Sequence, residues 1–266
     1  MQGFFSLIQT LYANRALIWQ LAVHDLRGRY ASSLAGAVWA IVNPVVVILV
    51  FWFVSVKGLR ITFETGPPFF LVLFCGLIPW MTFNEAVTGG AGAVLNRANL
   101  VKKIAFPLEI LPIVNILSSL IIHFFLVALL IVILVVSGVY PTLHFLQAIY
   151  FLIAMTALTT GLAWVFAALN VFSRDVGHGL GVTMTIWFWI TPIVWPVQNL
   201  SESALRIVQL NPLFYVVEGY HIAFLYGRPL LALWPLDLFF WVVTIILFVL
   251  GAVVFGRLKP HFAEVL

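Results

Sequence analysis

The chain has 266 residues, of which 64% are hydrophobic and 8% charged, and its formal net charge is +4. Soluble domains carry about 25% charged residues, so this composition excludes a soluble globular fold and indicates an integral membrane protein. The basic residues lie between apolar runs, a pattern typical of membrane orientation, and they therefore do not indicate nucleic-acid binding.

Residues 1–24 are predicted to form a helix that lies in the membrane interface. Apolar residues such as Phe4, Leu7 and Leu11 recur there at helical spacing, and polar residues such as Gln9 interrupt them. A helix with one apolar and one polar face is expected to lie along a bilayer surface rather than cross it.

Windows without Asp, Glu, Lys or Arg locate the membrane spans. A hydrocarbon core about 30 Å thick needs roughly 20 apolar residues per helix. The uncharged stretch between Glu109 and Arg174 is too long for one span, and residues 137–142, with Gly138 and Pro141, provide a natural break. The predicted spans are 34–56, 69–88, 110–137, 144–169, 176–197 and 230–255.

The segment 199–229 is apolar but contains charged residues, together with Pro212 and Gly219, so it is interpreted as short re-entrant or interfacial helices. The predicted fold is therefore an all-α membrane protein with six transmembrane helices, an N-terminal interfacial helix and short re-entrant helices between spans five and six. The whole chain, 1–266, is predicted to be a single transmembrane domain.

The distribution of Lys and Arg predicts that both termini are cytoplasmic. With six spans, one side of the membrane holds Arg15, Arg27, Arg29, Arg97, Lys102, Lys103, Arg174, Arg257 and Lys259, and the other holds only Lys57, Arg60, Arg206 and Arg228. A seventh span at 204–225 would weaken this bias, which favours the six-span alternative.

Several kinds of chemistry lack a sequence signal. The chain contains no Gly-x-x-x-x-Gly-Lys-Ser/Thr motif for ATP phosphates and no His pair at metal-ligand spacing. His123 lies in the third predicted span and fits either a proton relay or a helix-packing hydrogen bond. The acidic residues Glu85, Glu109 and Asp237 fall near predicted helix ends, which disfavours a proton-coupled secondary transporter. The loops also offer too few polar groups for an intramembrane enzyme such as a lipid-phosphate hydrolase.

Five segments, in this order and spacing, resemble the permease subunit of polysaccharide ABC exporters. They are DLRGRYASSLAGAVWAIVNP (25–44), NRANLVKKIAFPLEILP (96–112), NVFSRDVGHGLG (170–181), TPIVWP (191–196) and NPLFYVVEGY (211–220). That family includes O-antigen, capsule and teichoic-acid exporters, and the resemblance covers nearly the whole chain.

The resemblance implies a homodimer in the bacterial inner membrane, with two copies of a separate ATP-hydrolysing subunit on its cytoplasmic face. ATP and Mg would be bound by that partner, and this chain would hold no cofactor and no metal. The implied substrate is a glycan carried on undecaprenyl pyrophosphate, which passes through the channel while the lipid stays in the bilayer. An O-antigen exporter is favoured over a capsule or teichoic-acid exporter, and efflux of drugs or small lipids is a further alternative.

Three groups of residues are candidates for function. Arg27 and Arg29 lie just before the first span, at the depth where a pyrophosphate needs cations, although they could instead only enforce orientation. The candidate glycan-path aromatics are Trp80, Trp187, Trp189, Trp195, Phe214, Tyr215 and Tyr220, because sugar C–H faces can lie on aromatic rings. Trp187 and Trp195 are expected to share one helix face.

The candidate coupling residues lie in the two short loops that the six-span topology places inside the cell. The resemblance puts these loops against the ATPase subunit. The residues are Arg97, Asn99, Lys102, Lys103, Arg174 and Asp175. Because the loops are short and flanked directly by spans, a push on them is expected to tilt the helices.

Overall fold

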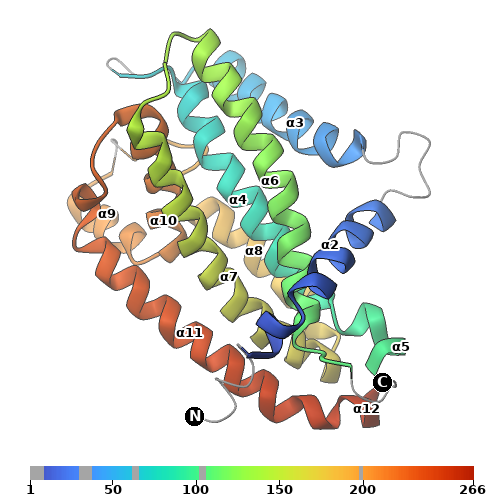
Figure 1. Ribbon diagram of the computed structural model, residues 1–266. Helices are drawn as coiled ribbons and strands as arrows, with labels where there is room; N and C mark the ends of the chain where they lie inside the picture. Colours follow the sequence, from blue (N-terminus) through green and yellow to red (C-terminus); the bar gives the residue numbers. More distant parts are fainter. Residues whose placement is uncertain (1–8, 30–37, 62–65, 102–105, 198–199) are drawn as a thin grey trace.

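A computed structural model describes residues 9–29, 38–61, 66–101, 106–197 and 200–266, which contain helices and no strand (Figure 1). The prediction of an all-helical fold is confirmed for this part of the chain. The α-helices are α2 (Arg15–Arg29), α3 (Trp39–Trp52), α4 (Phe69–Gly92), α5 (Ala98–Val101), α6 (Ile110–Val136), α7 (Gln147–Phe172), α8 (Asp175–Ile190), α9 (Glu202–Gln209), α10 (Pro212–His221), α11 (Leu236–Leu258) and α12 (Phe262–Val265).

Within the described residues, five helical segments are long and apolar enough to cross a membrane. They are Trp39–Gly58, Phe69–Gly92, Ile110–Val136, Leu143–Phe172 and Leu236–Val265. Each agrees with a predicted span to within a few residues, except that the last segment begins at Leu236 rather than at 230 and extends beyond 255. Pro235 directly precedes it and has a non-helical backbone, which explains the later start.

The long helices form one bundle with α4 and α7 at its centre. α4 packs against α6 and α7, and α7 packs along α11. α4 is buried along most of its length, whereas α3, α6 and α11 each expose a continuous apolar face. Exposed apolar faces of this length are expected in a protein whose solvent is lipid.

α2, α5 and α12 gather at one end of the bundle and α9 lies at the opposite end (Figure 1). α2 packs on α6, where the Ser118 hydroxyl donates to the Ala22 carbonyl at 2.9 Å. The predicted interfacial helix 1–24 ends later than expected, because α2 continues to Arg29. Its residues 1–8 lie outside the described part of the chain. Residues 34–37 of the first predicted span also lie outside it.

The fifth predicted span, 176–197, is wrong at its C-terminal end, because α8 stops at Ile190. Thr191 has an extended backbone and precedes Pro192, whose ring disfavours a helical conformation at the preceding residue. With 16 residues, α8 is about 24 Å long, shorter than a bilayer core. Trp187 and Trp195 therefore do not share a helix face.

The predicted interrupted segment 199–229 contains two short helices. Ser201 caps α9 by accepting from the Ala204 amide at 3.4 Å. Asn211 caps α10 by accepting from the Leu213 amide at 3.0 Å, and Pro212 takes the first helical position. α10 is buried against α4, α7 and α11, and its helical continuation ends at Gly227, in the left-handed conformation with φ 57°.

Candidate substrate path and coupling elements

A cavity of about 820 Å³, named here the inner cavity, opens between α3, α4, α6 and α8. Its polar lining comprises Asn43, Thr82, Asn84, Glu85, Thr88 and Thr185. Its aromatic lining comprises Phe51, Trp80 and Phe188, with the Phe188 ring 5.3 Å from Trp80 and 5.4 Å from Phe51. Such a mixture suits a ligand with hydroxyl groups and apolar C–H faces.

A second, smaller cavity of about 420 Å³ continues the polar lining toward the end of the bundle that holds α2 and α5. It shares Glu85 and Thr88 with the inner cavity. At its rim the Arg97 guanidinium forms an ion pair with the Asp25 carboxylate and so connects α2 to the segment after α4. A polar surface therefore runs along α4 from this end into the bundle.

A buried hydrogen-bond chain connects the inner cavity wall to α10. The Thr82 hydroxyl donates to the Ile78 carbonyl at 3.0 Å and lies 2.8 Å from His123 Nδ1. The Tyr220 hydroxyl lies 2.8 Å from His123 Nε2. Both ring nitrogens thus have neutral partners, an arrangement that supports a helix-packing role for His123 rather than a proton relay.

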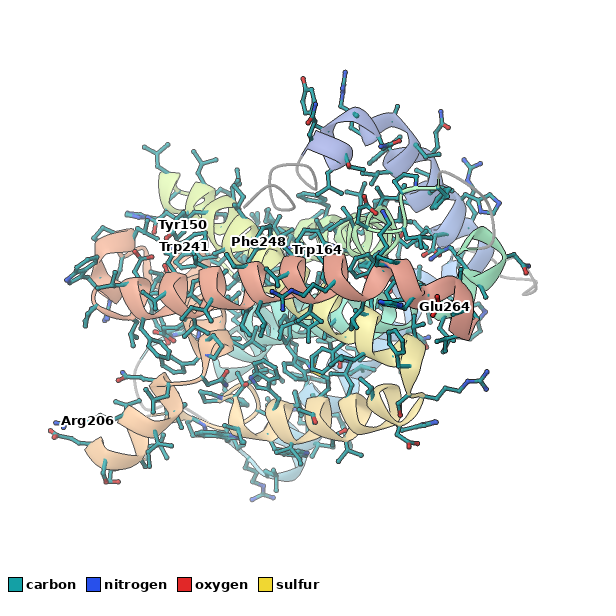
Figure 2. All side chains as sticks on the ribbon, turned by 90° about the horizontal axis from the view of Figure 1, so that it is seen from below. Tyr150, Trp164, Arg206, Trp241, Phe248 and Glu264 are labelled. Carbon is teal, nitrogen blue, oxygen red and sulfur yellow. The ribbon has the colours of Figure 1, made fainter. Side chains whose placement is uncertain are left out.

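A second polar cluster joins α7 and α10 to the start of α11. The Asp237 carboxylate accepts from the Tyr150 hydroxyl at 2.5 Å and also from the Tyr215 hydroxyl. The Trp241 indole donates to the Tyr150 oxygen at 2.6 Å, and Figure 2 shows these two side chains together beside α11. This cluster connects α7, α10 and α11 through hydrogen bonds that lipid cannot replace.

The short connection between α7 and α8 is held by Asn170. Its amide nitrogen donates to the Ala91 carbonyl at 3.0 Å, and its amide oxygen accepts from the Gly177 backbone at 3.0 Å. The exposed Arg174 lies in this connection, and the exposed Asp175 begins α8. Asn170 therefore joins this connection to the end of α4.

The structure distributes the predicted aromatic residues among several environments. Trp80 lines the inner cavity, while Trp195 and Phe214 line a separate cavity beside α9, and Trp189 is exposed. The remaining predicted aromatics, Trp187, Tyr215 and Tyr220, are each held by a hydrogen bond inside the protein, Trp187 to Asn211 at 2.7 Å.

The predicted basic residues also differ in their surroundings. Arg97 is paired with Asp25, whereas Arg27 and Asn99 are exposed. The side chains of Arg29, Lys102 and Lys103 lie outside the described part of the structure.

Several polar residues of the site were not predicted from the sequence, notably Asn43, Asn84, Asn115, Asn170 and Glu218. The asparagines could have been identified from the sequence. An amide side chain in an apolar helix costs free energy in lipid, so it usually faces a polar partner or a cavity. Among the described residues, no group of three or more His, Cys, Asp or Glu side chains is placed to hold a metal ion.

Comparison with known proteins decides the family. The profile of the ABC-2 type transporter family matches residues 16–225. The chain belongs to the ABC-2 type transporter family. In such transporters the membrane permease binds no cofactor itself, and ATP is hydrolysed by a separate subunit, so this ABC-2 permease is a multi-pass transport subunit with an ATP-binding partner.

Relatives of this ABC-2 permease include exporters of cell-surface polysaccharides. It is 29% identical over 265 residues to the O-antigen export system permease protein RfbA of Myxococcus xanthus, covering 97% of this chain and 98% of that protein. It is 28% identical over 243 residues to the protein of the same name from Klebsiella pneumoniae, covering 91% and 92%. The Polysialic acid transport protein KpsM of Escherichia coli is 22% identical over 201 residues, covering 74% and 77%.

Proposed function

We propose that this ABC-2 permease exports a lipid-linked glycan, of the O-antigen type, across the bacterial inner membrane. The observation that carries the proposal is the inner cavity, in which amide, hydroxyl and aromatic side chains line a space among apolar helices. Hydroxyl-rich sugars need such hydrogen-bonding partners when they leave water. The names of the relatives in Myxococcus and Klebsiella support O-antigen as the glycan.

The permease works as a homodimer with two ATP-binding subunits and with undecaprenyl pyrophosphate as the lipid carrier. The exposed face of α8 supports the dimer: Gly179 and Gly181 have open space around them, and Val182 and Ile186 are exposed beside them. Small residues allow close approach of helices in a membrane. We infer that the short helix α8, together with the apolar turn that follows it, makes the sixth passage through the membrane; the Lys and Arg distribution supports cytoplasmic termini.

The first test deletes the gene for the permease in its host and then complements the deletion. Loss of O-antigen from the cell surface, with lipid-linked glycan accumulating inside and full recovery on complementation, is the expected result. The affinity-purified permease should bring down its ATP-binding subunit. Normal surface O-antigen in the deletion strain would reject the proposal, and loss of a capsule instead would favour the alternative that the relation to KpsM suggests.

A second test addresses the cavity itself. Replacing Asn84 by Leu together with Thr88 by Val removes polar groups from its lining. Because the Thr88 hydroxyl already donates to the Asn84 carbonyl at 2.6 Å, the expected loss is that of one hydrogen bond, from Asn84, of roughly 1.4 kcal/mol, or about tenfold in export. Thr156→Val is the control, because the Thr156 hydroxyl donates to Leu152 within its own helix and does not line the cavity.

A further inference from the structure

A third cavity of about 590 Å³, named here the outer cavity, lies at the end of the bundle opposite α2 and α5. It is enclosed by the start of α4, the turn after α8, the helices α9 and α10, and the segment that leads into α11. Pro192 ends α8 through the extended backbone of Thr191, and Pro192 and Pro196 both lie in the turn that follows and lines the cavity.

Glu218 and His221 form a side-chain pair in the wall of the outer cavity. His221 Nε2 is 3.0 Å from the Val72 carbonyl oxygen, and since a carbonyl can only accept, Nε2 carries a proton and donates it. His221 Nδ1 is 3.1 Å from Glu218 Oε2. His221 is thus fixed between α4 and α10, and it orients the Glu218 carboxylate, whose side chain is 28% exposed.

Aromatic rings lie in this lining among a larger number of aliphatic and proline side chains. Trp195 and Phe214 lie in the wall, and the Trp195 indole is fixed by donating to the Trp189 carbonyl at 3.0 Å. Trp234, with 60% of its surface exposed, also lines the cavity. Burial, and then the charge of Glu218, raise the pKa of the Tyr226 phenol, so this hydroxyl stays protonated and can donate a hydrogen bond.

We propose that the outer cavity is a saccharide-binding site that holds one sugar unit of the glycan as it emerges, an inference that rests on the proposed export function. The aromatic rings offer faces for sugar C–H groups, and Glu218 and Gln209 offer hydrogen bonds to its hydroxyls. The site retains the emerging chain on the outer side between cycles of ATP hydrolysis.

The charges of the lining favour a neutral sugar over a lipid headgroup. Among the described residues that line the outer cavity there is no Lys or Arg, and the Glu218 carboxylate lies beside His221. The Arg228 guanidinium, which does not line the cavity, lies over the Tyr226 ring, 5.6 Å from its centroid. A phosphate would need cations in this position and would be repelled by the carboxylate. The proposed occupant is therefore an uncharged pyranose ring rather than a phospholipid.

The experiment uses the complete exporter in cells that synthesise their own polysaccharide. Trp234 is replaced by the photo-crosslinker p-benzoyl-phenylalanine, and Leu238, which is exposed on α11 but does not line the cavity, is replaced by the same group as the matched control. After illumination, the purified permease is probed for attached polysaccharide by periodate labelling and for attached phospholipid by mass spectrometry. Surface glycan is measured in the same cells.

The expected result is a polysaccharide adduct at position 234 and only phospholipid at position 238. Glu218→Gln should lower the adduct at 234 about tenfold, as loss of a charge-assisted hydrogen bond implies. Tyr226→Phe, which removes one hydroxyl, should also lower it, and this second variant keeps the test valid if Glu218→Gln fails to fold.

Phospholipid alone or no adduct at position 234, in cells that still export glycan, would overturn the saccharide site while leaving the proposed function intact. A polysaccharide adduct insensitive to both variants would equally overturn it, because the glycan would then only pass by. Absence of glycan export from cells with the unmodified permease would instead reject the proposed function.

Discussion

Gly161 of α7 and Gly251 of α11 lie against each other, so that the backbones of the two helices touch. A methyl group added to Gly161 would come within 2.7 Å of the Leu247 carbonyl carbon, and one added to Gly251 would run into the Gly161 carbonyl oxygen. Backbone is the least adjustable neighbour, and small residues of this kind are how membrane helices approach closely. α7 and α11 are held together at this point.

Gly161→Ala is therefore expected to destabilise the permease by about 1–3 kcal/mol, the usual cost of overpacking. Reversible unfolding in mixed detergent micelles would measure the change in free energy. Gly256→Ala on α11 is the control, because open space surrounds Gly256 and alanine favours a helix. Equal stability of Gly161→Ala and Gly256→Ala would show that the close approach does not exist.

Tyr215→Phe removes one of the two phenols that donate to Asp237. Hydrogen bonds to charged groups contribute about 1.5–3 kcal/mol, so a loss of this size is expected, together with a weaker attachment of α10 to α11. Tyr140→Phe, at an exposed tyrosine, should leave the free energy of unfolding unchanged. The cluster would lose its proposed structural importance if both variants unfolded alike.

The loop between α7 and α8 is predicted to couple the permease to ATP hydrolysis. In the double variant Arg174→Ala with Asp175→Ala, the ATP-binding subunit should bind weakly or hydrolyse ATP without export. Asn170→Ala should have a similar effect, because it frees the loop from the end of α4. Export and ATPase rates in reconstituted vesicles measure the ratio of glycan moved to ATP consumed.

The matched control for this loop is another exposed pair of opposite charges, Glu202 and Arg206, which are 3.8 Å apart on α9. Figure 2 shows Arg206 at the end of the molecule opposite Glu264. Removing this pair should not alter the ratio. A normal ratio in the Arg174 and Asp175 double variant would assign coupling to the loop that contains Arg97 and Asn99.

Arg27 and Arg29 are predicted to help bind the pyrophosphate headgroup. Replacing both by Gln should lower export several-fold while leaving membrane insertion and ATPase pairing intact, since cations at that depth attract phosphate. Arg257→Gln, which removes a charge from an exposed residue near the C-terminal end, controls for net charge. Normal export by the correctly inserted double variant would leave only an orienting role for the two arginines.

Cysteine labelling tests the proposed topology. The natural Cys75 is buried and is replaced by Ala to give a background without thiols. A membrane-impermeant reagent should then label Ser201→Cys from outside the cell and Leu266→Cys only after the membrane is opened. Labelling of position 266 in intact cells would refute cytoplasmic termini.

The sequence by itself determined where the long helices lie. α4, α6 and α7 begin and end close to the predicted limits, because a bilayer requires long uncharged windows and such windows can be counted directly. Hydropathy alone did not find the end of α8, since the residues after Ile190 remain apolar. There Pro192 overrides hydropathy through the backbone of Thr191.

Only the tertiary structure decided which polar and aromatic side chains meet. Trp80 and Tyr220 were equivalent candidates in the sequence, yet Trp80 lines the inner cavity whereas Tyr220 is buried beside His123. Similarly, Val72 and His221 are 149 residues apart and share one hydrogen bond. Hydropathy measures the free energy of moving a side chain out of water, and it does not predict which neighbour that side chain contacts. The contacts depend on how the helices are rotated and how closely they pack.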